Sequence, residues 1–139
     1  MSGGTVDSAA KAKKARILAV DDNPDSITIM QSILESRGYQ VAVALTGADA
    51  LEQIQRDIPD VVLLDIMMPE ISGLDVLQQM KSDVNTSGIP VILVTAKTHD
   101  EDLMSGYQYG ADYYITKPFT AQQLLYGVEL VLGKGESVG

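Results

Sequence analysis

The chain has 139 residues, no cysteine, 45% hydrophobic residues and a formal net charge of -9. This length fits one domain with its own hydrophobic core, and the lack of cysteine excludes disulfide bonds and thiolate catalysis. The acidic balance disfavours direct nucleic-acid binding, and no apolar run reaches the roughly 20 residues needed to cross a bilayer. We therefore expect a cytoplasmic protein that binds neither nucleic acid nor membrane.

Short apolar or β-branched segments alternate along the chain with segments of helical periodicity. The expected strands lie at residues 16–20, 41–45, 61–65, 90–95 and 113–116. Strands that alternate with helices predict a parallel sheet covered on both faces. We expect a flexible leader over residues 1–13 and a flexible tail over residues 133–139, because both segments are rich in small and polar residues.

Capping residues indicate where the helices begin. Asn23 can cap a first helix with Pro24 in its first turn, and Thr46 can cap a second. A fourth helix is expected to begin near residues 100–102, whose carboxylates suit a helix amino terminus. Thr120 can cap a fifth.

The third expected helix lies between the third and fourth strands. Its periodicity fits Gly73 to Lys81, and we expect its buried side to carry Leu74, Leu77 and Met80.

Five polar residues fall at the carboxyl ends of the expected strands. Asp21 and Asp22 follow the first strand and Asp65 ends the third. Thr95 ends the fourth strand, and Lys117 follows the fifth. Because open parallel sheets bind ligands at this edge, we expect the five side chains to share one crevice.

Three carboxylates in one crevice repel one another strongly. Two like charges about 4 Å apart cost about 4 kcal/mol at the effective dielectric of a protein surface, and Lys117 alone cannot neutralise Asp21, Asp22 and Asp65. Mg²⁺, with Mn²⁺ as the alternative, takes oxygen ligands and shares sites with phosphoryl groups. The sequence therefore predicts a magnesium site in which Asp65 can attack phosphorus as a nucleophile.

Four motifs resemble the receiver domain of two-component response regulators, the CheY-like family. They are DD at 21–22, DIMMPEISG at 65–73, VTA at 94–96 and GADYYITKPF at 110–119. The resemblance covers residues 14–132, which we expect to form the receiver domain. It implies a flavodoxin-like (βα)5 three-layer sandwich whose five-stranded parallel sheet has the order 2-1-3-4-5.

The resemblance implies a phosphoacceptor and its metal ligands. Asp65 would accept a phosphoryl group from a phosphohistidine on a sensor histidine kinase or a histidine phosphotransfer protein. Asp21, Asp22, Asp65 and the backbone carbonyl of Met67 would bind Mg²⁺ directly or, for Asp21, partly through water.

The same resemblance assigns phosphoryl-binding and switch residues. Lys117, Thr95 and the backbone of Ala96 would bind the phosphoryl group, and Thr95 and Tyr114 would change conformation together. A packing role for Tyr114 has about equal support from the sequence. The resemblance also implies a cis peptide bond between Lys117 and Pro118.

Met67 and Lys97 lie where family members tune the lifetime of the phosphoryl group. Met67 offers no hydrogen bond to the attacking water, so we expect slow loss of phosphate.

Two other functions compete with the phosphoryl-accepting switch. A phosphohydrolase of the haloacid-dehalogenase type would have a second Asp where this chain has Met67, so we expect no enzyme that turns over an external substrate. A receiver-like scaffold that never takes phosphate conflicts with the intact acidic pocket.

The output of the expected switch is less defined by the sequence. The chain is expected to be a single-domain regulator or a receiver excised from a larger protein. The surface of helix four, strand five and helix five, with Tyr107, Tyr109 and Tyr126, is expected to bind a downstream protein or a second copy of the chain.

Overall fold

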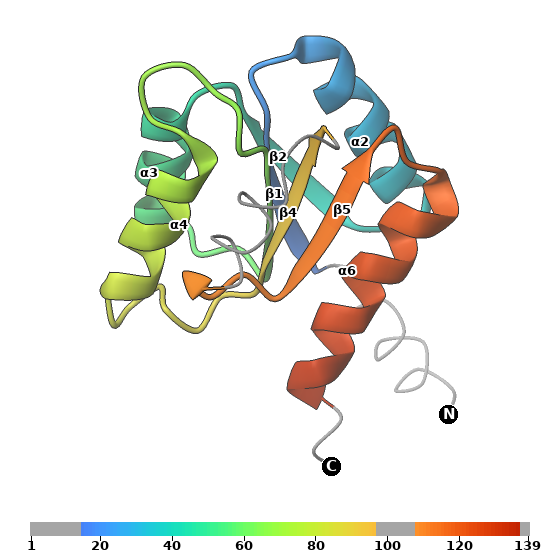
Figure 1. The fold of residues 1–139 in the computed structure, drawn as a ribbon. Coiled ribbons are helices and arrows are strands. Elements are labelled where there is room, and N and C mark those ends of the chain that lie inside the picture. The colour runs from blue at the N-terminus through green and yellow to red at the C-terminus, as the bar shows by residue number, and fades with distance from the viewer. Residues whose placement is uncertain (1–14, 97–107, 137–139) are drawn as a thin grey trace.

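The structure, a computed structural model, describes residues 15–96 and 108–136 (Figure 1). In this part of the chain the elements follow in the order β1 (Arg16–Val20), α2 (Pro24–Ser36), β2 (Gln40–Ala44), α3 (Gly47–Arg56), β3 (Val61–Leu64), α4 (Gly73–Ser82), β4 (Val91–Ala96), β5 (Tyr113–Lys117) and α6 (Ala121–Glu136). The expected helix near 100–102, and the expectations for Lys97 and Tyr107, lie outside the described residues.

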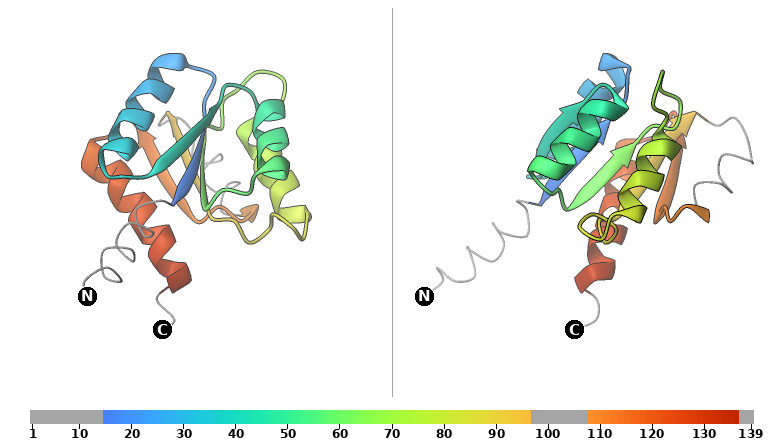
Figure 2. Two further views of the ribbon diagram at one scale, coloured as in Figure 1. Left: turned by 180° about the vertical axis from the view of Figure 1, so that it is seen from behind. Right: turned by 90° about the vertical axis from the view of Figure 1, so that its left-hand side faces the viewer.

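The five strands form one parallel sheet in the order β2-β1-β3-β4-β5. Helices α2 and α6 cover one face, and α3 and α4 cover the other, as the two views in Figure 2 show. This is the expected three-layer sandwich and strand order. All carboxyl ends of the strands therefore lie along one edge of the sheet.

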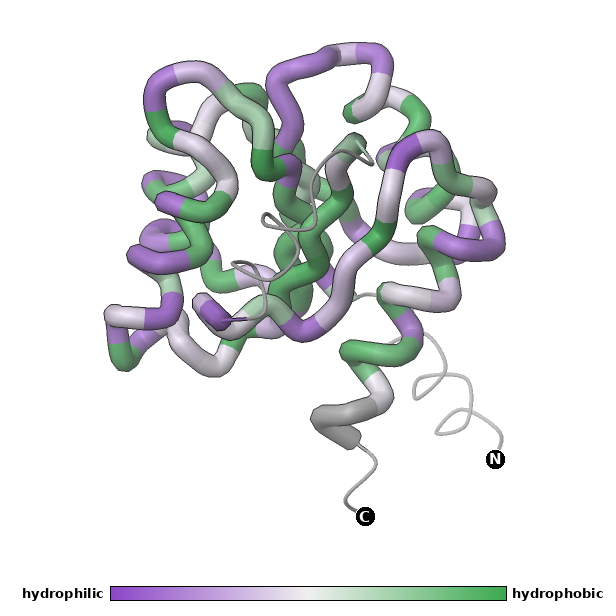
Figure 3. The backbone as a smooth tube through the Cα atoms, in the orientation of Figure 1, coloured by the Kyte–Doolittle hydropathy of each residue, from purple (hydrophilic) through white to green (hydrophobic). Residues whose placement is uncertain are grey.

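Alternate strand residues supply two separate hydrophobic cores. Leu18 and Leu64 point to the side of α3 and α4, whereas Ile17 and Leu63 point to the side of α2 and α6. Because the central strands are buried on both faces, they are apolar throughout, and they form the hydrophobic centre in Figure 3.

The three predicted caps begin their helices as expected. Asn23, Thr46 and Thr120 each accept a hydrogen bond from a backbone N–H of the first turn, at 2.9, 3.0 and 3.1 Å respectively. Each bond satisfies a donor that the helix itself leaves unpaired.

Helix α4 buries Leu77 and Met80 as predicted. Gly73 and Val76 are buried on the same side. These four residues have the spacing i, i+3, i+4, i+7 of one helical face. Leu74 is partly buried at the edge of this face and packs against the same core.

Three element ends lie beyond the predicted positions. Strand β4 continues past Thr95 to Ala96, and Lys117 is the last residue of β5 instead of following it. Helix α6 extends to Glu136, beyond residue 132, where we expected the domain to end. No helix in the described ranges is both long enough and apolar enough to span a membrane.

Candidate functional site

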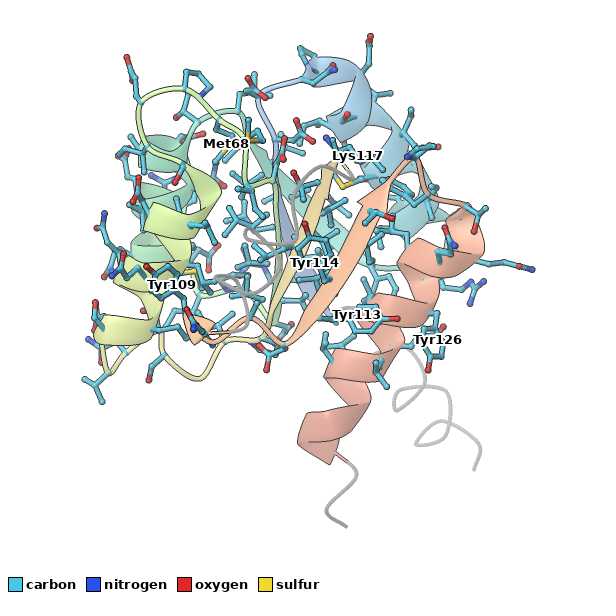
Figure 4. The ribbon with its side chains drawn as sticks, viewed as in Figure 1. Met68, Tyr109, Tyr113, Tyr114, Lys117 and Tyr126 are labelled. Carbon is cyan, nitrogen blue, oxygen red and sulfur yellow. The ribbon has the colours of Figure 1, made fainter. Side chains whose placement is uncertain are left out.

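The carboxyl edge of the sheet brings Asp21, Asp65 and Lys117 together. Asp21 and Asp65 each follow directly on a strand, and neighbouring β1 and β3 end in register at Val20 and Leu64. A hydrogen bond of 3.0 Å from the Asp65 N–H to the Val20 carbonyl continues this pairing. Lys117 reaches the same edge from β5 (Figure 4).

The Lys117 ammonium lies between two carboxylates. Its Nζ is 2.6 Å from Asp21 Oδ2 and 3.5 Å from Asp65 Oδ2. The sequence predicted that Lys117 lies near both carboxylates, but not that it is closer to Asp21 than to Asp65. The resemblance assigned Lys117 to the phosphoryl group and did not say which carboxylate it contacts in the unphosphorylated protein. In this structure Asp21 is the nearer partner.

Asp21 is the most firmly held carboxylate of the site. It is fully buried, and its Oδ1 accepts a hydrogen bond of 2.9 Å from the Asn23 N–H. Its Oδ2 accepts from Lys117. The sequence predicted only the capping role of Asn23, whereas its backbone N–H also orients Asp21. No signal in the residue type could reveal this, because any residue except proline supplies that N–H.

Burial raises the pKa of Asp65, and the nearby carboxylate of Asp21 raises it further. Lys117 lowers the pKa, as do the Thr95 hydroxyl and the Met67 N–H, which donates to Asp65 Oδ1 at 3.2 Å. The net direction is upward, because the lost hydration of a buried carboxylate outweighs these favourable contacts.

The pKa of Lys117 is raised as well. Burial lowers it, but the hydrogen bond with Asp21 and the charges of Asp65 and Asp21 outweigh the burial. Lys117 therefore stays protonated and supplies a fixed positive charge at the site.

The acidic residues fit a hard divalent cation. One carboxylate oxygen from each of Asp21, Asp22 and Asp65 lies within 4.8 Å of the others. Asp22 is exposed, whereas Asp21 and Asp65 are buried, so the cluster opens to solvent on one side. An all-oxygen ligand set with a solvent-accessible side suits Mg²⁺, which keeps several water ligands.

Thr95 lies in β4 beside this cluster. Its Oγ1 is buried and forms no hydrogen bond with any described residue. The hydroxyl nevertheless lies close enough to the Asp65 carboxylate to lower the pKa of that group. A buried hydroxyl without a partner is costly, so it is available for a new acceptor at the site.

Tyr114, the other expected switch residue, is partly buried. It packs against the core on the side of α3 and α4, and Figure 4 shows it in the middle of β5, below Lys117. The peptide bond between Lys117 and Pro118 is cis.

The loop after Asp65 is fixed by its approach to α4. The Gly73 N–H donates to the Ile66 carbonyl at 2.9 Å. A Cβ added at Gly73 would lie 2.0 Å from the Asp65 carbonyl oxygen, so this position requires glycine. Met67 lies in the same loop, with 59% of its surface exposed.

Similarity in sequence to known proteins shows which family this chain belongs to. The family model for the response regulator receiver domain matches residues 17–129. The chain is 42% identical over 118 residues to Protein PilH of Pseudomonas aeruginosa, a match that covers 85% of this chain and 98% of PilH. The chain therefore belongs to the response regulator receiver domain family, a family of signalling proteins.

Other relatives are longer. The chain is 37% identical over 123 residues to the DNA-binding response regulator MtrA of Mycolicibacterium smegmatis, and this match covers 88% of the chain but 53% of MtrA. The chain thus spans about half the length of that relative.

Solved structures share the fold closely. A CheY-like receiver domain protein from Methanospirillum hungatei has a TM-score of 0.85 at 31% identity, covering 91% of this chain and 99% of that protein. The receiver domain of the sensor histidine kinase PA1611 from Pseudomonas aeruginosa has a TM-score of 0.80 at 28% identity, covering 86% and 98%. The latter structure has a magnesium ion coordinated in its active site cleft.

Proposed function

We propose that Asp65 accepts a phosphoryl group in a Mg²⁺-dependent reaction and that the chain acts as a phosphorylation-controlled switch. The observation that carries this proposal is that Asp65 shares one site with two further carboxylates, Asp21 and Asp22, and with the Lys117 ammonium. The domain that performs this reaction begins near residue 14 and includes the whole of α6, to Glu136.

Each side chain has a defined part in the proposed reaction. Asp65 attacks phosphorus with a carboxylate oxygen and becomes an aspartyl phosphate. Phosphoryl transfer proceeds through a loose transition state, so the protein contributes mainly position and charge. Lys117 supplies positive charge to the phosphoryl oxygens, since it is already 3.5 Å from Asp65.

Asp21, Asp22, Asp65 and the Met67 carbonyl would hold Mg²⁺ or Mn²⁺. When bound, the cation neutralises charge on the carboxylates and on the phosphoryl oxygens. The fit of the three carboxylates supports this assignment.

The buried Thr95 hydroxyl, which has no hydrogen-bond partner within residues 15–96 and 108–136, supports a switch. A phosphoryl group on Asp65 brings strong hydrogen-bond acceptors to the site, to which Thr95 and the Ala96 N–H would donate. Leu93 of β4 is opposite Tyr114 of β5, and Thr95, two residues after Leu93, points to the same face of the sheet. Movement of Thr95 therefore changes the space beside Tyr114.

The donor of the phosphoryl group is a phosphohistidine on a sensor histidine kinase or a histidine phosphotransfer protein in the cytoplasm. The downstream partner is a protein or a second copy of the chain, which binds at the β5 and α6 face. Tyr126 is 57% exposed there, and its ring lies edge-on to Tyr113 at 6.3 Å between centroids. The net charge of -9 disfavours direct contact of this domain with DNA.

Mass spectrometry after incubation with acetyl phosphate and Mg²⁺ tests the central step. We expect one phosphoryl adduct, located on Asp65 and absent from the Asp65→Asn variant. A protein that gains no adduct, or gains it equally in the variant, would contradict the proposal. Release of many phosphates per protein from a phosphomonoester would instead support a hydrolase.

Met67 should make the phosphoryl group long-lived, because a thioether does not position water for attack. We expect Met67→Asn to lose phosphate about fivefold faster, the factor that one hydrogen bond of ordinary net strength supplies. The decay of the adduct after removal of acetyl phosphate measures this rate. Equal decay in the parent and the variant would remove Met67 from this role.

A further inference from the structure

The described methionines differ sharply in their access to solvent. Met30 and Met80 are 1% exposed and Met68 is 8% exposed, whereas Met67 is 59% exposed. A thioether that reaches solvent can be oxidised to a sulfoxide, and burial protects the others from the same reagent. Among the described methionines, Met67 is therefore the one that an oxidant in solution can reach readily.

Met67 also lies two residues after Asp65. Its N–H donates to Asp65 Oδ1 at 3.2 Å, so its backbone is directly beside the acceptor carboxylate. The loop around it is held by backbone bonds, since the N–H groups of Met68 and Gly73 both donate to the Ile66 carbonyl. A change in the chemistry of the exposed Met67 side chain can therefore act next to Asp65 without unfolding the loop.

We propose that Met67 is a peroxide-sensitive modification site whose sulfoxide shortens the lifetime of the phosphoryl group on Asp65. The sulfur lone pair of Met67 attacks one oxygen of a hydroperoxide and the O–O bond breaks. An S–O bond forms, sulfur loses two electrons, and the peroxide is reduced to water or an alcohol. No other co-reactant is needed.

The effect on lifetime rests on the proposed function and follows from the polarity of the product. A thioether is a weak acceptor, whereas the sulfoxide oxygen is a polar acceptor that can orient a water molecule toward the phosphoryl group. The sulfoxide carries no net charge, so it adds no repulsion to the cluster of Asp21, Asp22 and Asp65. We expect decay of the phosphoryl group to accelerate about fivefold, as for one added hydrogen bond.

The selectivity is tested first, without any phosphorylation. The native protein is treated with a limiting amount of hydrogen peroxide, digested, and mapped by mass spectrometry. We expect the sulfoxide at Met67 to form well before it forms at Met30, Met68 or Met80. Oxidation of Met67 at the same rate as these buried methionines would overturn the proposal.

The lifetime is tested next on the same protein. Oxidised and untreated samples are phosphorylated with acetyl phosphate, and decay of the Asp65 adduct is followed. The control is Met67→Leu treated identically, which keeps every other oxidisable residue but lacks this sulfur. We expect oxidation to accelerate decay of the adduct in the parent and not in Met67→Leu, and methionine sulfoxide reductase to restore the slow decay. We expect Met67→Gln to decay fast without oxidation, because its amide oxygen is an acceptor of similar reach.

The outcomes separate the two proposals. If the untreated protein takes up no phosphoryl group, the proposed function fails and the lifetime effect fails with it. If the untreated protein is phosphorylated at Asp65 but oxidation leaves the decay unchanged, only the present inference fails. Equal acceleration by peroxide in the parent and in Met67→Leu would place the effect at another residue and overturn the assignment to Met67.

Discussion

Asp65 is subject to two opposing requirements. A nucleophile for phosphorus must be ionised, yet burial and the nearby Asp21 raise its pKa and thus favour the protonated form. Lys117 and the Met67 N–H offset part of this penalty. The ionised Asp65 carboxylate therefore destabilises the fold at neutral pH. Binding of a cation, or transfer of a phosphoryl group to Asp65, lowers this cost.

This conflict predicts the pH dependence of the Asp65→Asn variant. Because the pKa of Asp65 is higher in the folded state, its ionisation opposes folding. The penalty begins near the ordinary aspartate pKa of about 4, grows up to the raised value, and is constant above it. Without metal, we expect the variant to be more stable than the parent at pH 7, and equal to it at acidic pH.

Denaturant unfolding across this pH range measures the difference. The control is Glu52→Gln, which removes an acidic side chain that is 73% exposed on α3. An Asp65→Asn variant that is less stable than the parent at pH 7, or whose advantage grows on acidification, would show that the sign is wrong.

At the scale of elements, the start of each helix and the buried strands follow from local chemistry. The caps at Asn23, Thr46 and Thr120 depend on neighbours within three residues, so the sequence was sufficient to predict them. The sequence also predicted that Lys117 and Asp21, 96 positions apart, share one crevice. It did not predict that Asp21 is nearer to the ammonium than Asp65, because that distance depends on how distant parts of the backbone pack together.

The close approach of α4 to the residues that follow β3 makes Gly73 the most restrictive of the described glycines. A Cβ at Gly73 would lie 2.0 Å from the Asp65 carbonyl oxygen, which belongs to rigid backbone. We expect Gly73→Ala to destabilise the fold by about 3 kcal/mol, the upper range for overpacking a core, and to reduce phosphoryl uptake because Asp65 must shift.

Gly88 provides the matched control, because a Cβ there would meet nothing within 4 Å. We expect Gly88→Ala to leave the free energy of unfolding nearly unchanged or to raise it slightly through the unfolded chain. Urea unfolding of both variants measures the difference. Equal stability of Gly73→Ala and Gly88→Ala would contradict the close approach of α4 to the Asp65 backbone.

At the scale of the whole molecule, the parallel sheet creates the site. Asp21 and Asp22 follow β1, Asp65 follows β3 and Lys117 ends β5, and only folding places them at one edge. In the unfolded chain these carboxylates are separate and bind a divalent cation weakly. A ligand that binds only the native state stabilises it by mass action, so metal affinity becomes a measure of correct folding.

We therefore expect Mg²⁺ to raise the stability of the protein by about 1.4 kcal/mol at about ten times its dissociation constant, and a chelator to reverse the gain. Thermal unfolding with increasing Mg²⁺ measures the effect. Asp22→Asn should abolish most of the gain, because it removes the exposed ligand of the cluster, whereas Glu52→Gln should retain it. An equal gain in all three proteins would mean that Mg²⁺ acts on the general acidity of the chain, with its net charge of -9, and not on the carboxylates gathered by the sheet.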